Sequence, residues 1–101
     1  MIKVFVSQPM NGLTDDEIYK NRMEILSHLP GGIENYEVLD TFITEDAPEG
    51  LSNPGLWYLG KSLEMMADAD MVIFAKGFQN NRGCLVEELA AEKYGLTRYY
   101  L

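Results

Sequence analysis

The chain of 101 residues is 47% hydrophobic, which supports one domain with a buried core and leaves no room for a second. Sixteen acidic residues against eight basic ones give a net charge of −8, which argues against a nucleic-acid backbone as partner, because such binding depends on clustered Lys and Arg. A nucleoside or nucleotide is compatible with this charge, because a single local pocket can hold one.

The first half of the chain alternates between strand and helix patterns. Residues 2–6 are apolar apart from Lys3 and predict a strand, and the turn residues of segment 7–12 predict a loop after it. Segment 14–17 matches a capping box and predicts the start of a helix, which the Pro-Gly-Gly sequence at 30–32 would stop. Residues 36–39 predict a second strand. The buried face of the helix is expected to comprise Ile18, Ile25, Leu26 and Leu29.

The second half repeats the alternation. Segment 41–52 is polar, acidic and irregular, as expected for a loop or a lid over a site. Asn53 as cap, with Pro54 at the first position, predicts a second helix. A third strand is expected at 71–75, a third helix at 83–94 and a last strand at 98–101. The inner stripe of the second helix is expected to comprise Leu56, Leu59, Leu63 and Met66.

This alternation predicts an α/β fold in a single domain, residues 1–101. We expect a three-layer sandwich with a mostly parallel sheet of four to five strands, flavodoxin-like or Rossmann-like, with helices on its faces. A sheet this small leaves edges that need cover. Association of identical chains would supply that cover, so we expect a homo-oligomer, a dimer or larger.

The cysteine content indicates where the protein resides. Cys84 is the only cysteine, so no intrachain disulfide can form, which is typical of a reducing compartment. No segment approaches the roughly 18 apolar residues that span a bilayer, and the N-terminus opens directly into an apolar strand. We therefore expect a cytoplasmic protein whose partners include neither a membrane nor a nucleic acid.

The stretch from Arg82 to Ala91 carries the strongest functional signal. It follows an apolar strand, and the pattern predicts a turn containing Gly83 and then a helix whose first turn carries a carboxylate. In an open α/β sheet this turn lies at the carboxyl edge, where such folds bind ligands. Successive helix positions rotate by about 100°, which places Glu87 on the border of the packed face and Glu88 further towards solvent. The packed face is taken here as Val86, Leu89, Ala90 and the stem of Lys93.

Glu87 is therefore the preferred catalytic candidate, although acidic residues near a helix start also occur simply because they complement the helix dipole. The same dipole is expected to lower the pKa of Glu87 and keep the carboxylate ionised, as a nucleophile requires. Asp70 precedes the third strand and is a candidate general acid, provided that burial raises its pKa. The alternative for Asp70 is a capping or turn aspartate.

The loop after the first strand is the candidate substrate-binding segment. It offers a hydroxyl, two amides and free backbone donors, which suit a sugar or phosphate better than a metal. It has neither the glycine spacing of a dinucleotide fingerprint nor the Lys of a P-loop. No His, Cys and Asp cluster has metal-ligand spacing, so we expect no metal and no cofactor. The candidate substrate-binding residues are Ser7, Gln8, Pro9, Met10, Asn11, Gly12 and Gly83.

Three stretches, at 4–12, 58–70 and 82–91, together resemble the nucleoside 2-deoxyribosyltransferase-like superfamily, and most closely its small DUF4406-type branch. In that superfamily a Gly-x-x-x-Glu step at a helix start places the nucleophilic glutamate, and Gly83 and Glu87 match it. The resemblance implies attack by Glu87 on the anomeric carbon of a nucleoside or nucleoside monophosphate, with Asp70 assisting departure of the base. Transfer of the sugar to another base, or to water, would follow from a covalent glycosyl-enzyme.

One departure keeps an alternative open. Characterised members often carry a tyrosine in the first strand that orients the glutamate, and the matching position here is Phe5, which has no hydroxyl. This difference favours a non-catalytic nucleotide-binding module on the same fold. A small accessory protein, with Glu87 only complementing the helix dipole, is a third reading. Superfamily members are usually oligomers in which a neighbour completes the pocket, which again implies self-association.

Overall fold

Four parallel strands form one sheet in the order β2-β1-β3-β4. In the computed structural model, which describes residues 1–101, the strands are β1 (Ile2–Ser7), β2 (Tyr36–Val38), β3 (Met71–Phe74) and β4 (Thr97–Tyr100). From β1 the chain moves outward to β2 and then returns past β1 to β3. The strand order therefore reverses between β1 and β3, and the carboxyl edge at this point is where open α/β sheets bind ligands.

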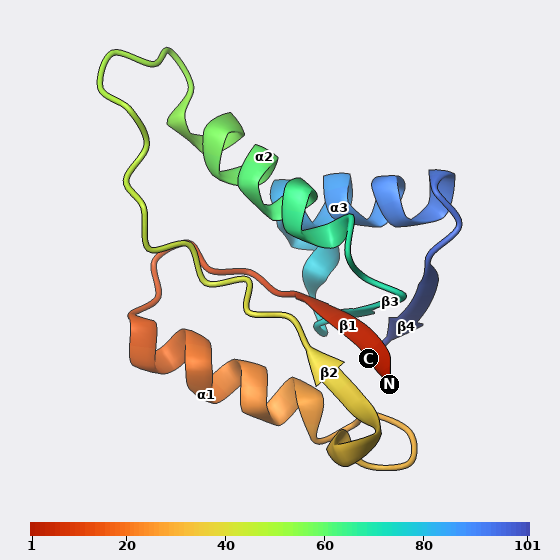
Figure 1. The fold of residues 1–101 in the computed structure, drawn as a ribbon. Helices are drawn as coiled ribbons and strands as arrows, with labels where there is room; N and C mark the ends of the chain where they lie inside the picture. Colours follow the sequence, from red (N-terminus) through yellow and green to blue (C-terminus); the bar gives the residue numbers. More distant parts are fainter.

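Helices cover both faces of the sheet (Figure 1). Helix α1 (Asp15–Leu26) lies on one face, and α2 (Pro54–Met66) and α3 (Arg82–Lys93) lie on the other. This arrangement confirms the predicted three-layer α/β sandwich with a parallel sheet, here of four strands. Two short 3-10 helices, Ile33–Asn35 and Phe78–Asn80, were not expected from the sequence. None of the helices is long and apolar enough to cross a membrane.

The two central strands are buried on both sides and alternate between two cores. In β1, Val4 and Val6 pack towards α1, whereas Phe5 packs towards α2 and α3. In β3, Ile73 joins the first core and Phe74 the second. This burial on both sides explains the uninterrupted apolar runs at residues 4–6 of β1 and 71–74 of β3.

The predicted helix starts are confirmed. Thr14 and Glu17 form the capping box of α1, with each side chain accepting a hydrogen bond from the other residue's backbone N–H. The Asn53 side chain accepts from the backbone of Leu56 at the start of α2. Ile18, Ile25 and Leu26 on the predicted inner face of α1 are buried, and Leu29 is buried as well but lies in the turn after the helix, which ends at Leu26, earlier than the predicted stop at 30–32.

The predicted inner stripe of α2 is only partly correct. Met66 is buried and Leu63 is partly buried against the same core, but Leu56 is 63% exposed. The first turn of α2 projects beyond the sheet, where no strand lies beneath it (Figure 1). The segment between β2 and α2 contains no helix or strand and extends away from the carboxyl edge, as expected for a loop or lid.

Candidate functional site

A cavity of about 470 Å³ lies at the carboxyl edge of β1, within the size range of small-molecule sites. Its walls come from the loop after β1, the segment after β2 and the first turns of α2 and α3. The residues that line the cavity include Phe5, Gln8, Met10, Asn11, Thr41, Phe42, Ile43, Tyr58, Arg82, Gly83, Cys84 and Glu87.

Glu87 is the central polar group of this cavity. Its side chain is 8% exposed, and its Oε1 accepts a hydrogen bond of 2.7 Å from the Ser7 hydroxyl. Burial raises the pKa of Glu87 to about 7, and the hydrogen bond from Ser7 opposes this rise. The expectation that the helix dipole would lower this pKa is therefore wrong. Helix α3 begins at Arg82 and has no acidic residue in its first turn, so Glu87 lies beyond the turn where the dipole acts, and desolvation dominates. Near neutral pH the group exists in both protonation states.

The face of α3 that packs on the sheet differs from the expected one. Cys84, Glu87 and Ala91 are buried, whereas Val86 and Leu89 are 40% and 54% exposed. The small side chains of Cys84 and Ala91 sit directly in the core behind β3, and the larger apolar residues point away. Glu87 thus lies within the buried face and not on its border. Glu88 is more exposed than Glu87, as expected.

Ser7 holds Glu87 from the first strand. Ser7 and Phe5 are two residues apart in β1, so strand alternation points both towards α3. Phe5 lines the cavity but has no hydroxyl, and Ser7 supplies one instead. From the sequence, Ser7 was predicted only as a substrate-binding residue, and its contact with Glu87 was not predicted. The period of two along β1, read from Phe5, was the signal that could have placed it beside Glu87.

Asp70 lies at the opposite end of the sheet. Its Oδ2 accepts a hydrogen bond of 2.9 Å from the backbone N–H of Lys3, and its own N–H donates to the Lys3 carbonyl. These contacts put Asp70 at the amino edge, with the four residues of β3 between it and the carboxyl edge. At about 3.3 Å per residue that separation excludes contact with the Glu87 side chain. Asp70 is also exposed, so the expected pairing with Glu87 is absent and Asp70 fits the turn alternative.

The predicted substrate loop contributes unequally to the cavity. Met10, Asn11 and Gly83 line it, whereas Pro9 and Gly12 do not. Gln8 also lines the cavity, but both ends of its amide are engaged within the protein. Its Nε2 donates to the Ile18 carbonyl at 3.1 Å, and its Oε1 accepts from Arg22 Nε at 3.1 Å. Gln8 therefore supports the wall of the cavity more than it offers free groups to a ligand.

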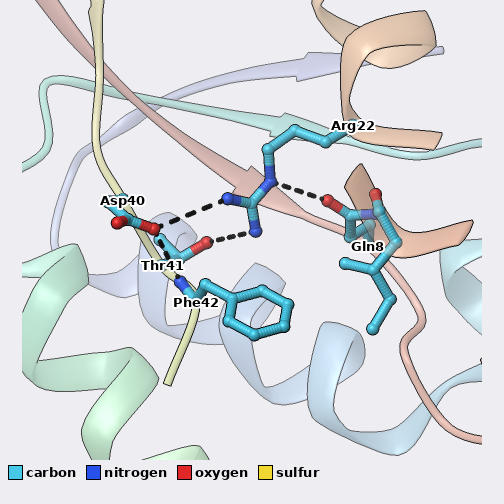
Figure 2. A network of polar contacts seen from close by, with 6 residues as sticks. Gln8, Arg22, Asp40, Thr41 and Phe42 are labelled. Carbon is cyan, nitrogen blue, oxygen red and sulfur yellow. Dashed lines mark hydrogen bonds and ion pairs between the residues drawn. The ribbon is translucent and has the colours of Figure 1, made fainter. Parts of the chain in front are cut away.

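Arg22 is the centre of a network of polar contacts with Gln8, Asp40 and Thr41, called here the Arg22 network (Figure 2). The sequence analysis did not identify this network. Arg22 is only 5% exposed, and the other buried residues of α1 are all apolar. Its Nη2 donates to Thr41 Oγ1 at 2.9 Å, and its Nη1 lies 3.9 Å from Asp40 Oδ1. Burial lowers the pKa of the Arg22 guanidinium, and the charge of Asp40 opposes this effect. Arg22 lies four residues after Ile18 and three before Ile25, on the face that these residues predict to be buried, and this spacing was the signal that could have identified it.

This network fixes one wall of the cavity. It joins α1 to the segment after β2, and Phe42 in that segment stacks on Tyr19 of α1 with ring centroids 4.9 Å apart. Thr41, Phe42 and the following Ile43 all line the cavity. Further along the segment, the backbone N–H of Ala47 donates to the Tyr58 hydroxyl on α2 at 3.1 Å. The segment is thus attached to helices on both faces of the sheet.

Charge is sparse in the cavity. Glu87 is the one carboxylate among its lining residues, and Arg82 is the one cationic side chain. Arg82 forms no ion pair, and its Nη2 lies 3.2 Å from where a Cβ on Gly55 would be. Burial, the largest effect, raises the pKa of the Cys84 thiol to about 11, so this neighbour of Glu87 stays neutral at physiological pH. No group of three or more His, Cys, Asp or Glu residues is placed to hold a metal ion.

The arrangement offers one buried carboxylate, held by a hydroxyl, in the wall of a cavity of small-molecule size. Comparison of the chain with protein-family models, with curated proteins and with solved structures gave no match.

Proposed function

We propose that the protein cleaves or transfers the N-glycosidic bond of a nucleoside or nucleoside monophosphate, with Glu87 as nucleophile. We also propose membership of the nucleoside 2-deoxyribosyltransferase-like superfamily, on the sequence resemblance alone. The observation that carries the proposal is the placement of Glu87. It is buried in the cavity wall, and one of its oxygens is held by Ser7 at 2.7 Å. A cytoplasmic location is proposed on the free, buried Cys84.

In the proposed reaction the ionised carboxylate of Glu87 attacks the anomeric carbon of the sugar. The Ser7 hydroxyl fixes the direction of the side chain and leaves the second carboxylate oxygen for the attack. The C–N bond breaks as the new C–O bond forms, the bonding electron pair leaves with the base, and a glycosyl ester on Glu87 results. Water or a second base then attacks the same carbon and releases Glu87. The choice between these acceptors separates a hydrolase from a transferase.

The test is chromatography of a mixed panel of nucleosides and 5′-monophosphates after incubation with the protein. The Glu87→Gln variant keeps the shape of the side chain and removes the nucleophile, and Glu88→Gln is the matched control one position along the helix. A free base or exchanged nucleoside should form with the wild type and with Glu88→Gln, and not with Glu87→Gln. Equal product from Glu87→Gln would reject this mechanism.

A non-catalytic nucleotide-binding module is the second candidate. Two observations favour it: Glu87 is partly protonated near neutral pH, and no second carboxylate lines the cavity. A folded protein that forms no product across the panel, but whose melting temperature rises with particular nucleotides, would support this candidate. If the protein forms no product and no nucleotide changes its melting temperature, the result would support the third hypothesis, a small accessory protein.

We further propose that the protein is a homo-oligomer. Leu56 at the start of α2 and Val86 and Leu89 on α3 form an exposed apolar surface, called here the α2–α3 face. These helices lie side by side on the same side of the sheet (Figure 1). Leu56 and Val86 also line the cavity, so the α2–α3 face borders its opening. Contact with a second copy would remove this apolar surface from water.

A further inference from the structure

We propose that the substrate is an N-glycoside whose base carries a positive charge. This inference rests on the proposed glycosidic function and names the class of substrate. Its basis is that this chain lines the cavity with a nucleophile in Glu87 but with no second carboxyl group and no imidazole to act as general acid.

The leaving group decides what such a site can cleave. A neutral base departs as an anion unless a proton reaches it, and a positioned general acid contributes typically about 10²–10⁴-fold in rate. A cationic base takes the bonding electron pair and departs neutral, so that no proton has to be supplied. A site without a general acid therefore favours cationic bases over neutral ones.

The residues of the cavity leave the acid role unfilled. Asp70 lies at the amino edge of the sheet, and Glu87 cannot attack as an anion and donate a proton in the same step. Arg82 stays protonated in proteins and is not a proton donor. Thr41, Tyr58 and Ser62 bring hydroxyls to the cavity wall, and hydroxyl groups are much weaker acids than a carboxylic acid or an imidazolium. The Cys84 thiol, with a pKa of about 11, is a poor acid near pH 7.

The electrostatics of the cavity agree with a cationic base. Burial of Glu87 without a cationic partner disfavours its ionised form, and a positive ring beside it restores that form. Arg82 does not fill this role, because it starts α3 about 7.5 Å along the helix axis from Glu87 and lies against the start of α2. Phe5, Phe42 and Tyr58 also line the cavity, and aromatic faces attract cations.

The step balances without an additional reagent. The Glu87 carboxylate oxygen forms a bond to the anomeric carbon as the bond to the ring nitrogen breaks. The electron pair of the breaking bond stays on the ring nitrogen and neutralises the positive charge of the base. In the second step water attacks the anomeric carbon, Glu87 departs as a carboxylate, and the proton of the water is released to solvent.

The test is run at pH 6 and compares 7-methylguanosine, whose base is cationic at this pH, with guanosine, which lacks the methyl group and has a neutral base. Both are used as nucleosides and 5′-monophosphates, in the ribose and the 2′-deoxyribose series. Release of base is followed by chromatography, and the rate with Glu87→Gln is subtracted as background. We expect kcat/KM for the methylated compounds to exceed that for the neutral ones by about 10²–10⁴-fold. Equal or faster cleavage of guanosine would overturn the proposal and leave the glycosidic function standing.

A binding measurement separates recognition of a cationic base from cleavage of the glycosidic bond. Melting temperatures are recorded with each compound at pH 6, where the base of 7-methylguanosine is cationic, for the wild type and for Glu87→Gln. We expect 7-methylguanosine to raise the melting temperature of the wild type more than guanosine does, and this difference to vanish in Glu87→Gln. If neither compound is cleaved but the difference is present, recognition of a cationic base stands and the glycosidic function fails. If neither compound is cleaved and no difference exists, both fail.

Discussion

The Ser7 hydroxyl donates a hydrogen bond of 2.7 Å to Glu87, joining two residues that are 80 positions apart in the sequence. Ser7 ends the first strand and Glu87 lies on the third helix, so the contact forms only when β1 and α3 have packed on the same side of the sheet. The fold thus assembles the site from its two ends. The hydrogen bond also limits how far burial raises the pKa of Glu87.

Removal of this hydroxyl should raise the pKa of Glu87 further. In Ser7→Ala the carboxylate loses the hydrogen bond that favours its ionised form, while its burial is unchanged. We expect the pH–activity profile to move to higher pH and activity at pH 7 to fall by roughly tenfold, since a hydrogen bond to a charged group is worth about 1.5–3 kcal/mol. The same shift should be visible by NMR titration of Glu87. Ser7→Thr keeps the hydroxyl and serves as control; an unchanged profile in Ser7→Ala would contradict this role.

Stability should depend on pH through Glu87 in a defined direction. The folded state holds this proton up to pH about 7, whereas the unfolded chain releases it near the ordinary value of 4.5. The folded state therefore binds more protons between these values, and the free energy of unfolding decreases as pH rises from about 4.5 to 7. Above pH 7 the full loss, on the order of 3 kcal/mol, is present.

Glu87→Gln removes this titration. We expect the variant to have about the same stability as the wild type at pH 4 and to be more stable at pH 8. Urea unfolding of both proteins across this range measures the difference. A difference that does not change with pH would show that Glu87 is not desolvated in the folded protein.

The Arg22 network should act on substrate binding more than on the chemical step. Thr41→Val removes the acceptor of the Arg22 Nη2 donor and leaves a buried polar group unpaired, which costs about 1–3 kcal/mol of stability. We expect faster hydrogen exchange at residues 40–43 in the ligand-free protein and a KM raised more than kcat is lowered. Thr44→Val, in the exposed part of the same segment, is the matched control. Equal exchange in both variants would show that Arg22 does not hold this wall.

Self-association should depend on the α2–α3 face. Leu89→Glu places a charge in this surface, and we expect it to shift the protein towards the monomer in sedimentation or light-scattering measurements. Met23→Glu is the control, because Met23 is similarly exposed but lies on α1, across the sheet. A wild-type protein that is monomeric at all concentrations, or an equal effect of both variants, would contradict this proposal.

The fold was largely predictable because its signals are local. The capping box at Thr14, the Asn-Pro start of α2 and the apolar run of β3 each predict an element without knowledge of the rest of the chain. The errors arise where packing between elements decides. On α3 the apolar stripe of Val86 and Leu89 is exposed, because close packing on the sheet selected the smaller residues Cys84 and Ala91.

The site was less predictable than the fold. Glu87 could be proposed from its place after a Gly turn, but the reason given for its orientation and the direction of its pKa were wrong. Asp70 was paired with Glu87 because both flank β3, although one precedes the strand and the other follows it, so that the rise of about 3.3 Å per residue was enough to separate them. The Arg22 contacts connect residues on three separate elements, and such contacts follow from tertiary structure alone.

The most direct test of the account is mass spectrometry of the acid-quenched reaction with the best substrate of the panel. The account predicts a covalent pentosyl or deoxypentosyl adduct on the peptide that contains Glu87, and no adduct with Glu87→Gln. Rapid turnover of substrate by Glu87→Gln, or an adduct on another residue, would contradict the central claim that Glu87 is the nucleophile.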